Sequence, residues 1–208
     1  MKNFVNYFAV VLIATVTVLS ACHSGAKDST ALADSVNQKQ ILTTDSANKA
    51  NLNNTDSTLK ARKTLKEDAS KFLVKSYEAG MFEIQLSQLA ATKALDTDVK
   101  KLAASLGMAH TSINAQISTL CTAANFVLPG SINDDHQKSL LEASKLTGAD
   151  FDRNYINIVI AGHEKSVSNY KDAYNNLAPG ETKTFAGETL PKIEDHLAIA
   201  KRVRERIK

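Results

Sequence analysis

Three of the five histidines fall on the apolar stripe of segments with a helical repeat, and a glutamate holds that place in a fourth segment. These residues are Glu83, His110, His163 and His196. Imidazole and carboxylate groups together suit zinc, iron, copper, nickel or manganese. Because a buried polar side chain costs free energy unless it has a partner, four of them, one per segment, favour a shared site. The sequence therefore predicts one transition-metal ion, with these four residues as its candidate ligands.

The same residues allow two other interpretations. A buried hydrogen-bond network without metal would pair Glu83 with a protonated histidine. Alternatively, the positions are unrelated and each histidine is an ordinary core residue. The neighbouring acids Glu164 and Asp195 are candidates for outer partners that orient metal-bound imidazoles, and Glu164 also fits an exposed surface position.

Four segments carry these residues, and each repeats apolar positions in steps of four and three, as one face of a helix does. The repeats span residues 65–90, 99–120, 156–177 and 186–207. The chain has only three prolines and eight glycines among 208 residues, which also favours helices. We expect an all-α fold, an antiparallel four-helix bundle.

The breaks between the repeats fit this architecture. Asp96 is a candidate N-cap for the second helix, and Pro129 with Gly130 follows its end. A short accessory helix over residues 134–146 is expected between the second and third helices. Pro191 either kinks the fourth helix or starts it, because proline is tolerated in the first helical turn.

Depth along the bundle axis tests whether the four polar residues meet. At about 1.5 Å per residue, His163 lies ~21 Å before the helix end near Leu177, and His196 lies ~21 Å after the helix start near residue 182. His110 lies ~21 Å from the start of its helix, whereas Glu83 lies ~14 Å from the same turn. This mismatch of about one helical turn is within the precision of the expected helix bounds, so all four residues are expected to share one layer of the core.

The N-terminus has the features of an export signal. Residues 7–19 are uncharged and mostly apolar, too few for a membrane span and suited to a signal-peptide core. Leu19 to Cys22 reads LSAC and resembles a bacterial lipoprotein lipobox. The resemblance implies cleavage after residue 21 and lipidation of Cys22, which would anchor the protein in a membrane. Ser24 stands where an inner-membrane retention signal has aspartate, so we expect an outer-membrane lipoprotein facing the periplasm.

Residues 22–60 are rich in Ser, Thr, Asn, Asp and Lys, and no aromatic residue occurs between Phe8 and Phe72. Such a composition buries little apolar surface, and we expect a flexible tether. The alternative is a loose helix around Leu59 to Lys66 that merges into the domain. The domain organisation is then a signal peptide over 1–21, the tether over 22–60 and the bundle over 61–208. The net charge of +3 and the lack of a nucleic-acid-binding motif exclude a nucleic-acid partner.

Three stretches carry a resemblance to a known family: EIQLSQLAATKALDTDVKKLAASLGMAH, LTGADFDRNYINIVIAGHEKSV and FAGETLPKIEDHLAIAKRV. Residues 70–205 resemble the bacterial domain-of-unknown-function family DUF4142. The resemblance implies a ferritin-like bundle in an exported protein, with the family's glutamate and histidine positions falling on the four candidate ligands. Ferritin-like di-iron sites use Glu-x-x-His pairs, but the residues three before the histidines are Gly107, Ile160 and Ile193. A di-iron centre is therefore not expected.

These observations predict a non-catalytic envelope lipoprotein whose bundle core binds one transition-metal ion. A metal-dependent oxidoreductase or hydrolase is the first alternative, and it requires an open coordination position on the metal. A structural or partner-binding module without metal is the second, in which the polar residues only fix the helix register.

Overall fold

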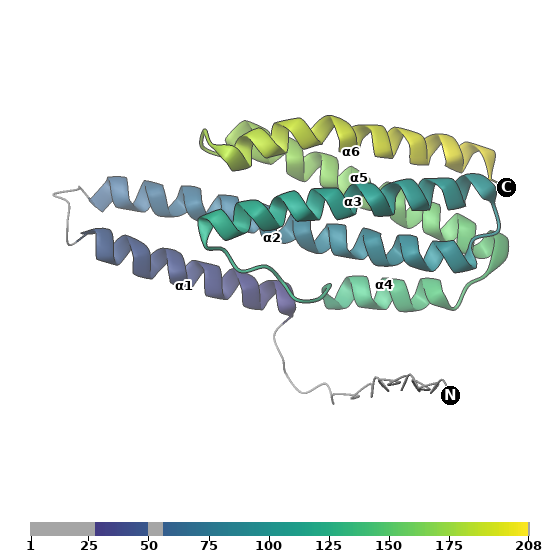
Figure 1. The fold of residues 1–208 in the computed structure, drawn as a ribbon, viewed down its shortest axis with the longest axis horizontal. Helices are drawn as coiled ribbons and strands as arrows, with labels where there is room; N and C mark the ends of the chain where they lie inside the picture. Colours follow the sequence, from purple (N-terminus) through teal and green to yellow (C-terminus); the bar gives the residue numbers. More distant parts are fainter. Residues whose placement is uncertain (1–27, 50–55, 208) are drawn as a thin grey trace, which may run out of the picture.

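The computed structural model describes residues 28–49 and 56–207, and this part of the chain is all-α (Figure 1). Its helices are α1 Ser29–Lys49, α2 Asp56–Lys93, α3 Thr97–Ala124, α4 Asp134–Ser144, α5 Gly148–Asn176 and α6 Glu181–Arg206. The long helices α2, α3, α5 and α6 lie along one another, while α1 and α4 both lie against α2. The expected all-α class and the accessory helix α4 are confirmed.

The turn between α2 and α3 is fixed by two aspartates. Asp96 caps α3, as expected, and its carboxylate accepts hydrogen bonds from the backbone N–H groups of Asp98 and Val99. Asp152 of α5 accepts from the N–H groups of Leu95, at 3.0 Å, and Asp96, at 2.8 Å. The buried Asp152 therefore ties α5 to the turn between α2 and α3.

Replacing Asp152 by alanine is expected to lower the free energy of unfolding by about 2 kcal/mol, because two backbone donors lose a charged acceptor. Urea unfolding of the variant measures this. Asp150→Ala is the matched control, since its exposed pair with Arg153 contributes at most about 0.5 kcal/mol. Equal losses in the two variants would contradict the assigned role.

Helix α4 is held against α2 by its first turn. Asn133 caps α4 through a hydrogen bond from the His136 backbone N–H. The buried carboxylate of Glu78 accepts from the Asn133 N–H at 2.8 Å and from His136 Nδ1 at 2.7 Å. The His136 ring also stacks on Phe82, with 4.1 Å between ring centroids. His136 thus serves to dock the accessory helix.

Helix α6 runs unbroken from Glu181 to Arg206 with Pro191 inside it. Of the two expectations for this proline, a helix start at that position is excluded. Helix α3 ends at Asn125, whose left-handed φ of 57° stops the helix before Pro129.

Residues 29–49 form helix α1, so the prediction of a flexible tether is wrong for this segment and for the start of α2 at Asp56. Ala33 and Ile41 are buried against the bundle. Between them, the Asn37 side chain donates to the Val127 carbonyl at 2.9 Å and accepts from its N–H at 2.6 Å. Polar anchoring, which the composition did not reveal, holds α1 in place.

The predicted signal peptide over 1–21, the lipidation site Cys22 and the remaining tether residues 23–27 and 50–55 lie outside the described residues. Within 28–49 and 56–207, none of the helices combines the length and the apolar character that crossing a membrane requires.

Candidate metal centre

The side chains of His110, His163 and His196 converge from α3, α5 and α6 in the interior of the bundle. Each offers a ring nitrogen that lies within 4.8 Å of those of the other two. The ring centroids are 5.4 to 5.6 Å apart, and Nε2 of His110 is 3.5 Å from Nε2 of His163. We call these residues the three-histidine cluster. Among the described residues, it is the one group of three or more His, Cys, Asp or Glu side chains close enough to share an ion.

The cluster forms a polar layer between two apolar parts of the core. On α3, Leu106 belongs to one apolar cluster and Ile113 to the other, with His110 between them. On α6, Ile193 and Ala200 flank His196 in the same way. These spacings of three and four residues keep each histidine on the buried face of its helix.

The imidazoles are held in the neutral form. Burial, and then the neighbouring imidazoles, lower the pKa of His110 to about 3. Burial is also the main cause that lowers the pKa of His163 to about 4, and it lowers the pKa of His196. Neutral imidazole is the form that binds metal, so no proton has to leave these rings at neutral pH.

The orientation of His163 is fixed by the backbone. Its Nδ1–H donates to the Val159 carbonyl at 2.9 Å, which leaves the lone pair on Nε2, the atom that faces His110. A hydrogen bond from the second ring nitrogen to a carbonyl is the usual support of a metal-bound histidine. His196 has a buried Nδ1 without a hydrogen-bond partner in the described part of the chain.

Glu83, the fourth candidate ligand, lies outside the cluster, on the other side of the His163 ring. Its Oε1 is 3.6 Å from His163 Nδ1, whereas the nitrogen that faces the cluster is Nε2. Oε2 is buried and has no hydrogen-bond partner among the described residues. Burial raises the pKa of Glu83 to about 8. The carboxyl group is therefore placed to support His163 rather than to share an ion with it.

The two other acids from the sequence analysis are exposed. Glu164 pairs with Lys201 Nζ at 2.8 Å. The charge of Asp195 raises the pKa of His196, but by less than burial lowers it. Neither acid orients a ring of the cluster by a hydrogen bond that the structure shows.

Gly162 was missed by the sequence analysis. A Cβ atom at this position would lie 3.2 Å from Glu83 Oε1, closer than most side-chain contacts. The small residue therefore lets the carboxyl group approach the helix that carries His163. The only sequence signal was a glycine directly before that histidine.

Two hollows reach the site from opposite sides. A cavity of about 490 Å³ between α2, α4 and α5 has Glu83 and His110 in its lining. A smaller hollow of about 200 Å³ between α3 and α6 has His196 in its lining.

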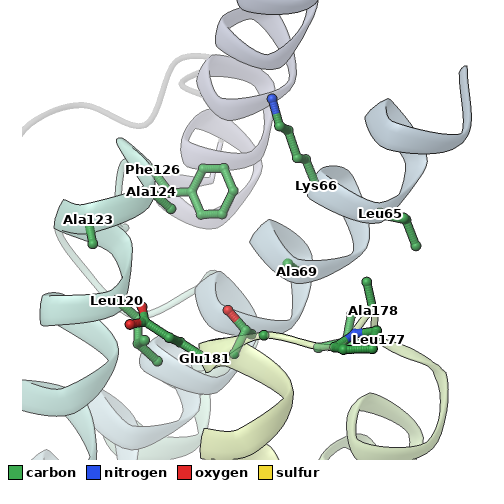
Figure 2. A pocket seen from close by; sticks show the side chains of 13 residues that line it. Leu65, Lys66, Ala69, Leu120, Ala123, Ala124, Phe126, Leu177, Ala178 and Glu181 are labelled. Carbon is green, nitrogen blue, oxygen red and sulfur yellow. The ribbon is translucent and has the colours of Figure 1, made fainter. Parts of the chain in front are cut away.

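A third pocket, of about 330 Å³, lies at the far end of the bundle (Figure 2). It is formed by the start of α2, the end of α3 and the turn between α5 and α6. Most of its lining is apolar, including Leu65, Leu120 and Leu177. Because Leu177 is ~21 Å along α5 from His163, this pocket takes no part in the metal centre.

The buried titratable groups predict a stability maximum near pH 6.5 for the metal-free protein. Below this pH, histidines with a pKa of 6.5 in the unfolded chain bind protons, whereas His110 and His163 in the folded chain stay neutral. Acidification therefore favours the unfolded state. Glu83 acts oppositely, because its raised folded pKa makes stability fall as pH rises from 4.5 to about 8. From pH 6.5 to 5, the loss from two histidines exceeds the gain from one glutamate, and the free energy of unfolding is expected to fall by about 1.5 kcal/mol.

Urea unfolding at several pH values, with chelator present, measures this profile. Stability that increases on acidification from pH 6.5 to 5 would contradict the lowered pKa values, because it would show that the folded imidazoles take up protons as readily as the unfolded ones. In Glu83→Gln the loss of stability above pH 6.5 is expected to disappear, while the loss of stability below pH 6.5 remains.

Solved structures with a similar fold come from another family of unknown function. A DUF305 fragment from Deinococcus radiodurans matches with a TM-score of 0.60 at 13% identity, over 67% of this chain and 96% of that one. A DUF305 protein from Streptomyces coelicolor matches with a TM-score of 0.56 at 11% identity, over 65% and 89% of the two chains. At such identities the likeness establishes the fold alone.

No curated protein matches the sequence. The family described as "Domain of unknown function (DUF4142)" matches residues 54–203. This span holds the three-histidine cluster, Glu83, helices α2 to α5 and all but the last three residues of α6. It covers well over half of the chain, so the expected family is confirmed: the protein belongs to the DUF4142 family.

Proposed function

We propose that the protein binds one transition-metal ion through His110, His163 and His196, inside an antiparallel, ferritin-like four-helix bundle. The observation that carries the proposal is the convergence of three neutral imidazoles whose donor atoms lie within 4.8 Å of one another. Three histidines from the protein, with a further position for water or another ligand, are a known ligand set for zinc.

The donor set also narrows the choice of metal. Imidazole suits zinc, copper, iron and nickel, whereas manganese, magnesium and calcium prefer oxygen ligands. The cluster contains nitrogen donors only, and Glu83 lies behind His163. We therefore place zinc, copper, iron and nickel ahead of manganese.

Elemental analysis of the full-length chain, purified without a metal-binding tag, tests the proposal. After incubation with each metal and dialysis, about one ion per chain is expected, because the three neutral imidazoles form one site. His110→Ala, analysed in parallel, is expected to lose it. A wild-type chain that retains none of the metals would refute the proposal and favour a structural or partner-binding module.

We also propose that the protein is an envelope lipoprotein anchored through Cys22, on the outer membrane and facing the periplasm. Support comes from the apolar segment 7–19 followed by LSAC at residues 19–22. Mass spectrometry of the protein from native membranes is expected to find Cys22 as the acylated first residue. A chain that retains residues 1–21, or an unmodified Cys22, would contradict this assignment.

A further inference from the structure

Two members of the three-histidine cluster are closed off from solvent by the bundle, whereas His196 is partly exposed. His163 is 1% exposed and His110 6% exposed. A metal ion arrives hydrated, and charged species are costly to move into an apolar interior. Loading therefore needs a path on which polar ligands replace the water of the ion.

The cavity between α2, α4 and α5 has such ligands at increasing depth. Asp135 is exposed at its rim, and the His136 side chain, 30% exposed, lies against the buried Glu78. Glu83 and His110, both buried, lie on its inner wall. Carboxylate oxygen and imidazole nitrogen thus occur from the surface to the first ligand of the cluster.

Glu83 is the residue whose surroundings indicate that an ion binds in the cavity in passing. It is 5% exposed, and its Oε2 has no hydrogen-bond partner among the described residues. A buried polar atom of this kind calls for a partner that is bound at least part of the time. Glu83 and His110 both line the cavity, which makes the Glu83 carboxyl group available to anything that enters.

The hollow on the opposite side is a poorer path. Its volume is about 200 Å³, and its lining includes Lys101 and Arg206. The carboxylate of Asp98 is already engaged there, at 3.2 Å from Arg206 and 3.9 Å from Lys101. Lys75 and Lys165 stand at the wall of the larger cavity in the same way, and all four cations are exposed, so solvent and salt screen their charges on both sides. The two sides differ in that Asp98 is engaged, whereas Glu83 Oε2 has no hydrogen-bond partner among the described residues.

We infer that the cavity between α2, α4 and α5 is the path by which the metal ion reaches the three-histidine cluster, with Glu83 as the last oxygen ligand before His110. This inference rests on the proposed metal binding. An ion leaves by the path through which it enters, so narrowing the cavity slows binding and release equally. The dissociation constant then stays the same.

Stopped-flow mixing of the metal-free, full-length chain with cobalt(II), followed by its visible absorption, tests the path. Ala161→Phe on α5 and Ser139→Phe on α4 place bulk in the cavity from two sides. Ser105→Phe places the same bulk in the opposite hollow and is the matched control. Circular dichroism confirms that each variant is folded.

Both cavity variants are expected to bind cobalt at least about tenfold more slowly, with release slowed by the same factor, while the control keeps wild-type rates. Wild-type rates in both cavity variants, or slowing in the control alone, would overturn the path without affecting the binding site. A wild-type chain that binds no cobalt, zinc, copper, iron or nickel at equilibrium would instead overturn the proposed function, and the path with it.

Discussion

His196→Ala is expected to lower the affinity for the bound metal by at least about 100-fold. Loss of an outer-sphere partner alone costs 10- to 100-fold, and this substitution removes a ligand. His196 is the best of the three positions to test, because it is only half buried while His110 and His163 are fully buried. Its removal is therefore expected to lower the free energy of unfolding less than removal of either other histidine. Competition against a chelator of known affinity measures the change.

His136→Ala is the matched control for this experiment. His136 lies in the same molecule against Glu78 and Phe82, but it is not a member of the three-histidine cluster. Its removal is expected to loosen α4 and leave the equilibrium affinity unchanged. Wild-type affinity in His196→Ala, or an equal loss in both variants, would show that the ion binds elsewhere.

The layer of three histidines could be predicted because helical geometry converts sequence spacing into depth. Steps of three and four residues place His110, His163 and His196 on buried faces, and about 1.5 Å per residue makes them level. The same arithmetic leaves Glu83 about one turn away, but the expectation is that all four residues share one layer. The structure corrects this for Glu83, whose carboxyl group reaches Nδ1 of His163 and not the side of that ring which faces His110.

What the spacing could not give is the role of Glu83. A position on the apolar stripe of a helix predicts that a side chain is buried, but not which face of a neighbouring ring it contacts. That detail depends on Gly162, which allows the close approach of the carboxyl group, and on the hydrogen bond from His163 to Val159. Val159, Gly162 and His163 all lie within about one turn of α5, but Gly162 meets Glu83 of α2, and apolar periodicity carries no information about either interaction.

Helix α1 shows a different limit. Ala33, Asn37 and Ile41 are spaced by four residues and are all buried, yet the middle one is polar and the surrounding composition is that of a loop. Asn37 is buried because the Val127 backbone supplies both a donor and an acceptor. When only apolar positions are counted, Asn37 is evidence against a packed helix at this place. In the structure it is the residue that anchors the helix.

Glu83→Gln is expected to abolish proton release on metal binding and to lower affinity by roughly 10- to 100-fold. Three neutral imidazoles leave the full charge of a divalent ion in the core. With its pKa raised to about 8, Glu83 is mostly protonated at pH 7. Ionisation of its carboxyl group then offsets part of the charge, and metal binding at pH 7 should release about one proton. The imidazoles, with pKa values of about 3 and 4 for His110 and His163, should release none.

Isothermal titration calorimetry in two buffers of different protonation enthalpy measures the released proton. Because one proton leaves, wild-type affinity should rise about tenfold per pH unit up to pH 8 and then level off, while Glu83→Gln should show no such rise. Glu78→Gln is the control, since that buried carboxylate on the same helix bonds Asn133 and His136 instead. Proton release that persists in Glu83→Gln would come from an imidazole or from a metal-bound water, and Glu83 would then not be the group that ionises.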